Sequence, residues 1–189
     1  MNFLERAAKL RREADVVMQA IGLQKILRPY GPVTMTGSYF LDVMVYPDID
    51  LYIPGISIEQ FFMIGAQLAG CDEVFHVIFE KSFLENLPGG LYMQARVKWG
   101  EWERPWKIDI WSLDEKLLRQ QMEPMLSFKE KMTSEKRARI IHYKMSVLTL
   151  EKRTPRYSGF FIYKAFLDEG LVDDDQVTAY LVANGIKMS

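Results

Sequence analysis

The chain has 189 residues, a formal net charge of −1 and a single cysteine. This length suits one domain, or a small domain with a helical extension. A near-neutral charge argues against nucleic acid as a partner, and one cysteine excludes an internal disulfide or a cysteine-rich zinc site. No apolar run reaches the ~20 residues that span a bilayer, and the first residues lack the apolar centre of a signal peptide. We therefore expect a cytoplasmic protein that does not contact a membrane.

The first part of the chain predicts helices alternating with strands. Residues 2–21 and 57–68 each begin with a capping-box pair and repeat apolar side chains at helical intervals. Strand-forming runs, rich in β-branched and aromatic residues, occupy positions 33–36, 48–53, 73–80, 91–99 and 106–113. A glycine at position 100 separates the last two runs, so we expect these to form a hairpin.

From residue 114 onward the pattern is helical. Helices are expected near residues 114–131, 134–150, 158–168 and 174–183. This change divides the chain into an α/β core, residues 1–113, and a C-terminal helical region, residues 114–189. The expected fold class is α+β, with the sheet in the first part.

Two of the expected strands carry acids opposite their apolar side chains. Side chains alternate between the faces of a strand, so Asp48 and Asp50 point away from the apolar residues of the run 48–53. Asp109 does the same in the run 106–113. If the two strands are neighbours, three carboxylates converge and repel one another, which raises the pKa of at least one. Such a group of oxygens suits Mg²⁺ or Mn²⁺.

A turn follows the run 33–36, at Gly37 and Ser38. Glycine lets the backbone approach a phosphate closely, and the following amides and the serine hydroxyl are donors to it. A phosphate-binding turn followed by three metal-binding acids is the equipment of phosphoryl or nucleotidyl transfer.

The order Gly37-Ser38, Asp48-Ile49-Asp50-Leu51 and Ile108-Asp109-Ile110 resembles the polymerase-β-type nucleotidyltransferase superfamily over residues 34–113. This superfamily includes the small antibiotic and minimal nucleotidyltransferases. The resemblance implies a nucleotidyltransferase-type mixed β-sheet flanked by helices, with a C-terminal helical part. One departure is that Tyr39 and Phe40 follow the turn, where many members have small residues and an Arg-Gly pair.

The resemblance also implies roles for individual residues. Gly37 and Ser38 would contact the triphosphate, Asp48 and Asp50 would ligate two metals, and Asp109 would ligate the catalytic metal and accept the proton of the attacking hydroxyl. Family members often reach the outer phosphates with a basic residue of the helical part, and two residues of the helix 134–150, Arg139 and Lys144, are candidates. The alternative, which we favour for this charge-rich helix, is a solvent-exposed face.

The function implied is metal-dependent transfer of an NMP group from an NTP to a hydroxyl acceptor, on a small molecule, a protein or an RNA end. The neutral charge argues against RNA. The short chain suggests a homodimer that completes the acceptor pocket. An alternative of another class is a catalytically silent nucleotidyltransferase fold that serves as an interaction or regulatory module. A metal-dependent glycosyltransferase fits poorly, because only 47 residues precede Asp48.

Overall fold

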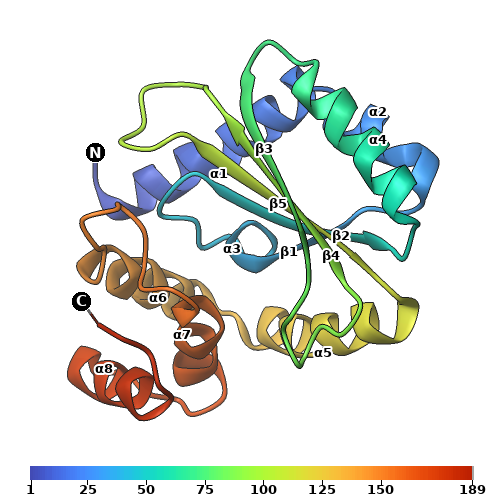
Figure 1. Ribbon diagram of the computed structural model, residues 1–189. Helices are drawn as coiled ribbons and strands as arrows, with labels where there is room; N and C mark the ends of the chain where they lie inside the picture. The colour runs from blue at the N-terminus through green and yellow to red at the C-terminus, as the bar shows by residue number, and fades with distance from the viewer. Residues whose placement is uncertain (189) are drawn as a thin grey trace.

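The computed structural model describes residues 1–188 and contains a five-stranded mixed sheet with helices on both faces (Figure 1). The strand order is β1-β2-β5-β4-β3, and only the β2–β5 pair is parallel. The strands are β1 (Thr34–Thr36), β2 (Asp48–Pro54), β3 (Val74–Lys81), β4 (Leu91–Val97) and β5 (Trp106–Leu113). The expected α+β class is confirmed, and β4 and β5 pair as the expected antiparallel hairpin.

The helices fall into two groups along the chain. Those of the sheet region are α1 (Phe3–Ala20), α2 (Leu23–Leu27), the 3₁₀ helix η1 (Arg28–Tyr30), α3 (Gly37–Phe40) and α4 (Ile58–Ala69). Those that follow the last strand are α5 (Glu115–Lys131), α6 (Ser134–Ser146), α7 (Ser158–Leu167) and α8 (Asp174–Ala183). In Figure 1 the second group lies together on the side of the sheet opposite α2 and α4.

The capping signals in the sequence place the starts of two helices correctly. The side chain of Asn2 accepts from the Glu5 amide and that of Ser57 from the Gln60 amide, each with the reciprocal bond of a capping box. Sequence periodicity missed α2 and η1, because helices of five and three residues are too short to show a repeat. Helix α6 ends at Ser146, four residues before the expected end.

The apolar face of the sheet fixes the direction in which the acids point. Ile49, Leu51 and Ile53 of β2 are fully buried, with Ile108 and Ile110 of β5, under α1, α2 and α4. Each such side chain contributes roughly 1.5–3 kcal/mol by burial. A shift of β2 by one residue would expose three of them, so the aspartates between them must face the other way.

A second hydrophobic cluster joins α5, α6, α7 and α8. It also takes in Ala7 of α1 and Leu41, Val43 and Val45 of the segment before β2. Helix α5 begins after Asp114, whose side chain accepts from the Leu117 amide at 2.8 Å. The division into residues 1–113 and 114–189 stays a prediction. None of the helices among residues 1–188 is both long and apolar enough to cross a bilayer.

Candidate active site

Three aspartates converge on the face of the sheet that is directed toward the C-terminal helices. The parallel pairing of β2 with β5 sets Asp50 opposite Asp109 and Asp48 opposite Lys107. One carboxylate oxygen of each aspartate lies within 4.8 Å of the others. We call Asp48, Asp50 and Asp109 the acid cage.

Gly37 brings the turn before α3 into contact with the acid cage. The antiparallel register of β1 and β2 places Thr36 opposite Asp50, so the next residue meets the Asp50 side chain. A Cβ at position 37 would collide with Asp50 Oδ2. Gly37 also has a φ of +61°, a conformation that glycine adopts without strain. Both observations require glycine here.

Ser38 follows Gly37 and is more enclosed than expected, with 7% of its surface exposed. It lies in α3, a single helical turn whose N-cap residue, Thr36, makes no side-chain capping bond. The first amides of a helix have no acceptor within it. The turn therefore has donors near the acid cage, but the serine hydroxyl is largely covered.

Lys107 is a residue of the site that the sequence patterns did not predict. Its ammonium lies 2.6 Å from Asp109 Oδ2 and 3.1 Å from Asp48 Oδ1, with 20% of its side chain exposed. The bond to Asp109 is a hydrogen bond, whereas Asp48 Oδ1 is buried without a hydrogen-bond partner. The spacing of two residues from Asp109 was the available signal, because it places both side chains on one face of β5.

Burial and mutual repulsion shift the pKa values of the carboxyl groups in the acid cage. The pKa of Asp50 is raised well above its usual range by burial and then by the charge of Asp48, against the opposing charge of Lys107. Burial and Asp48 likewise raise the pKa of Asp109. The expected direction is confirmed, with burial rather than repulsion as the largest cause. The pKa of Lys107 is raised because the three carboxylates outweigh the effect of its burial.

Aromatic and amide side chains continue the polar face beyond the acid cage. The Tyr92 hydroxyl donates to Asp109 Oδ1 at 2.9 Å and accepts from Gln94 Nε2 at 3.2 Å. The Tyr92 ring packs against Trp111, with 4.7 Å between centroids. Burial and the charge of Asp109 raise the pKa of Tyr92, so its hydroxyl stays protonated and donates to the carboxylate.

Arg139 and Lys144, the two candidates for contact with the outer phosphates, lie in different surroundings. The prediction of a solvent-exposed face is wrong for Lys144, which is 1% exposed and donates to the Val43 carbonyl at 2.7 Å. Burial lowers the pKa of Lys144 to about 8, against the attraction of Asp48 and Asp50. Arg139 instead pairs with Glu135 on the surface of α6, at 3.0 Å. Contact of either with a nucleotide stays a prediction, and each would first have to leave its present partner.

The buried ammonium of Lys144 gives a test by pH. Its folded-state pKa of about 8 lies below the unfolded value of about 10.4. The unfolded chain therefore binds more protons between these values, and the contribution of Lys144 to stability rises with pH across this window. Urea unfolding at pH 7.5 and 9.5 should show the wild type gaining stability relative to Lys144→Met. Equal pH slopes for the two proteins would contradict a lowered pKa for Lys144 in the folded state.

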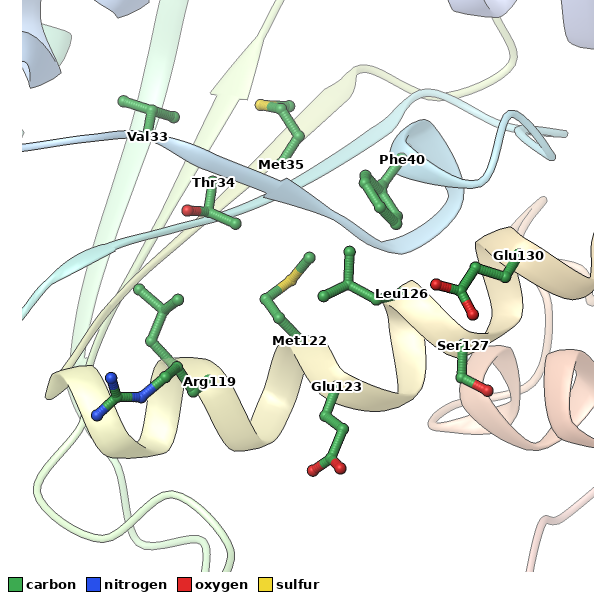
Figure 2. Close-up of a pocket in the computed structure, with 11 residues that line it drawn as sticks. Val33, Thr34, Met35, Phe40, Arg119, Met122, Glu123, Leu126, Ser127 and Glu130 are labelled. Carbon is green, nitrogen blue, oxygen red and sulfur yellow. The ribbon is translucent and has the colours of Figure 1, made fainter.

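A pocket between the sheet and the C-terminal helices lies at the edge of the sheet. A pocket of about 780 Å³ lies between β1 and α5, with Met35 and Phe40 on one side and Met122 and Leu126 on the other (Figure 2). None of the three acids lines it. A second pocket, of about 660 Å³, lies between the start of α1 and α6 and includes Arg139. Asp48 and Asp109 are each 8% exposed and pair with Lys107.

The acid cage nevertheless has the oxygen ligands that a divalent cation needs. It offers carboxylate oxygens from three residues, the hard ligands preferred by Mg²⁺ and Mn²⁺. Asp50 makes no ion pair with Lys107 among the described residues, and burial and neighbouring charge raise its pKa. A cation would relieve this cost, so the residues present fit a metal.

Comparisons with known proteins identify the fold. No protein-family model and no curated protein sequence matches the chain. The solved structure of the Cid1 poly(U) polymerase bound to MgGTP is similar, with a TM-score of 0.50 and 12% identity over 75% of this chain and 43% of that one. A structure of a cytoplasmic RNA terminal U-transferase has a TM-score of 0.47 and 13% identity over 77% of this chain and 43% of that one. The structure of the GLD-2/RNP-8 complex has a TM-score of 0.49 and 14% identity over 94% of this chain and 64% of that one. The chain spans less than half the length of the first two.

Proposed function

We propose, from the nucleotidyltransferase fold that this chain has, that it is a metal-dependent enzyme that moves an NMP group from an NTP to a hydroxyl acceptor. The observation that carries the proposal is the acid cage, whose three carboxylates lie within 4.8 Å of one another beside the Gly37 turn. A bound divalent ion would polarise the α-phosphate and neutralise the charge that develops during transfer.

The residues of the acid cage and of the Gly37 turn would have different roles in such a transfer. Asp48, Asp50 and Asp109 would hold the metal. Asp109 would also accept the proton of the acceptor hydroxyl. The hydroxyl oxygen would bond to the α-phosphorus as pyrophosphate leaves. The raised pKa of Asp109 favours this role, because it makes the carboxylate a stronger base. The amides after Gly37 would bind the triphosphate. Ser38 would donate its hydroxyl after the atoms that enclose it have moved.

The acceptor would approach along β4. Tyr92 already contacts Asp109, and its register in the sheet places Gln94 and Arg96 on the same face. A hydroxyl next to Tyr92 would lie beside the proposed base. A small hydroxylated molecule, a protein hydroxyl and an RNA end are all compatible with this face. The expectation against nucleic acid is not supported, and the homodimer stays a prediction.

The rival reading is a silent nucleotidyltransferase fold that binds a partner. Its support is the enclosure of the site, since Asp48 and Asp109 are each 8% exposed and paired with Lys107. Pairing with Lys107 does not by itself exclude a metal, however, because Asp50 makes no ion pair with this lysine among the described residues. The raised carboxylate pKa values favour the enzyme, since such perturbations gather at active sites.

Binding of Mg²⁺ with an NTP separates these readings. At concentrations near 100 Kd, the ligand should raise the melting temperature by roughly 5–10 °C, through about 2.7 kcal/mol of linkage. The Asp48→Asn/Asp50→Asn variant should lose most of this shift. Asp72→Asn, an exposed acid before β3, is the matched control and should keep it. A wild type that responds to none of the four common NTPs with Mg²⁺ would defeat the proposed enzyme.

A further inference from the structure

Lys107 is a cation built into the acid cage. Its ammonium contacts two of the three carboxylates, at 2.6 Å from Asp109 and 3.1 Å from Asp48. Its side chain is 20% exposed, so surrounding water screens these contacts only partly. Of the three acids, Asp50 alone has no ion pair with this lysine among the described residues.

The position of Lys107 follows from the sheet rather than from a flexible loop. It lies in the middle of the cage face because β2 and β5 pair in parallel, with Asp48 directly opposite Lys107 and Asp50 opposite Asp109. The buried side chains of Ile108 and Trp106 on either side fix β5 in this register. The sheet therefore sets the ammonium between Asp48 and Asp109.

Lys107 changes the net charge of the acid cage. Two like charges 4 Å apart repel by about 4 kcal/mol at an effective dielectric constant of 20. Three close carboxylates therefore need a counter-charge, or one of them must bind a proton. With Lys107 included, the formal charge of the group is −2, which a single divalent ion cancels. A second divalent ion would have to compete with the ammonium for Asp48 and Asp109.

We propose that Lys107 acts as the permanent second cation of this site, so that the cage binds one divalent ion with a nucleotide rather than two. Asp50 and the remaining lone pairs of Asp48 and Asp109 would hold that ion, while the ammonium keeps its contact with Asp109. Lys107 would then offset one of the three negative charges of the cage before nucleotide arrives. This inference rests on the proposed function, because it concerns the metal content of the same site.

Counting Mn²⁺ tests the inference without turnover. The protein is titrated with Mn²⁺ in the presence of a saturating α,β-methylene NTP analogue, and free Mn²⁺ is measured by electron paramagnetic resonance. The wild type should bind one Mn²⁺ per chain–nucleotide complex. Lys107→Met removes the ammonium at similar length and should bind two. Lys98→Met, an exposed lysine at the end of β4, should bind one.

A second readout uses the metal-free protein. In EDTA, Lys107→Met should melt at least several degrees below the wild type, because the three carboxylates lose their counter-charge, and Mn²⁺ should restore most of the difference. If that variant does not fold, the wild-type count still decides. Two Mn²⁺ per wild-type complex, or one in Lys107→Met, would overturn the inference and leave the proposed function standing. No Mn²⁺ bound with nucleotide would instead defeat the proposed function.

Discussion

Replacing Asp109 with asparagine is expected to lower nucleotidyl transfer by about 10²–10⁴-fold with little loss of stability. The substitution removes a metal ligand and the proposed base together. Asparagine keeps the size of the side chain and an oxygen that can accept from Tyr92, which donates to Asp109 at 2.9 Å. It also removes one of three mutually repelling carboxylates, which offsets the lost ion pair with Lys107.

The measurement is the initial rate of label transfer from an NTP labelled at the α-phosphate, with melting temperature recorded in parallel. Asp72→Asn serves again as the control and should retain the wild-type rate. Retention of transfer by Asp109→Asn to within a few fold would remove Asp109 from the chemistry. Loss of transfer together with a collapse of the melting temperature would indicate a structural role instead.

The second large effect is expected at Gly37. Gly37→Ala combines a strained φ of +61° with a collision between the new Cβ and the Asp50 carboxylate. Gly22→Ala is a close match, because Gly22 has a φ of +62° but no atom within 4 Å of the added Cβ. The strain, about 1 kcal/mol, is common to both, and the collision adds roughly 1–3 kcal/mol at position 37 alone.

Urea unfolding of the two alanine variants isolates that difference. Gly37→Ala should lose about 1–3 kcal/mol more unfolding free energy than Gly22→Ala, and should also lose the Mg²⁺-dependent stabilisation by NTP because Asp50 is displaced. Equal destabilisation by the two substitutions would show that the turn does not pack against Asp50.

Strand patterns carried most of what the sequence could predict about the site. The alternation in residues 48–53 and 106–113 is a property of the local chain, and it requires the aspartates to oppose the buried isoleucines whatever the rest of the fold does. The two capping boxes are local in the same sense. The neighbouring position of the two strands was a conditional expectation, and the parallel register confirms it.

The parts that sequence could not give depend on distant segments. Lys144 belongs to a helix with basic residues on several faces, and its burial follows from packing against Val43 and Tyr163, which precede and follow it in other segments. The approach of Gly37 to Asp50 follows from the β1–β2 register. Lys107 differs, since its two-residue spacing from Asp109 was visible and only the ion pair across to Asp48 required the fold.

The most direct measurement follows the two ends of the triphosphate. The protein is incubated with Mg²⁺, a panel of small hydroxylated molecules, proteins and short RNAs, and an NTP labelled at either the α- or the γ-phosphate. Nucleotidyl transfer predicts that the α-label joins an acceptor, with an added NMP mass, while the γ-label leaves as pyrophosphate. A γ-label that joins the acceptor, or an α-label that stays in intact NTP across the whole panel despite Mg²⁺-dependent NTP binding, would contradict the proposed enzyme.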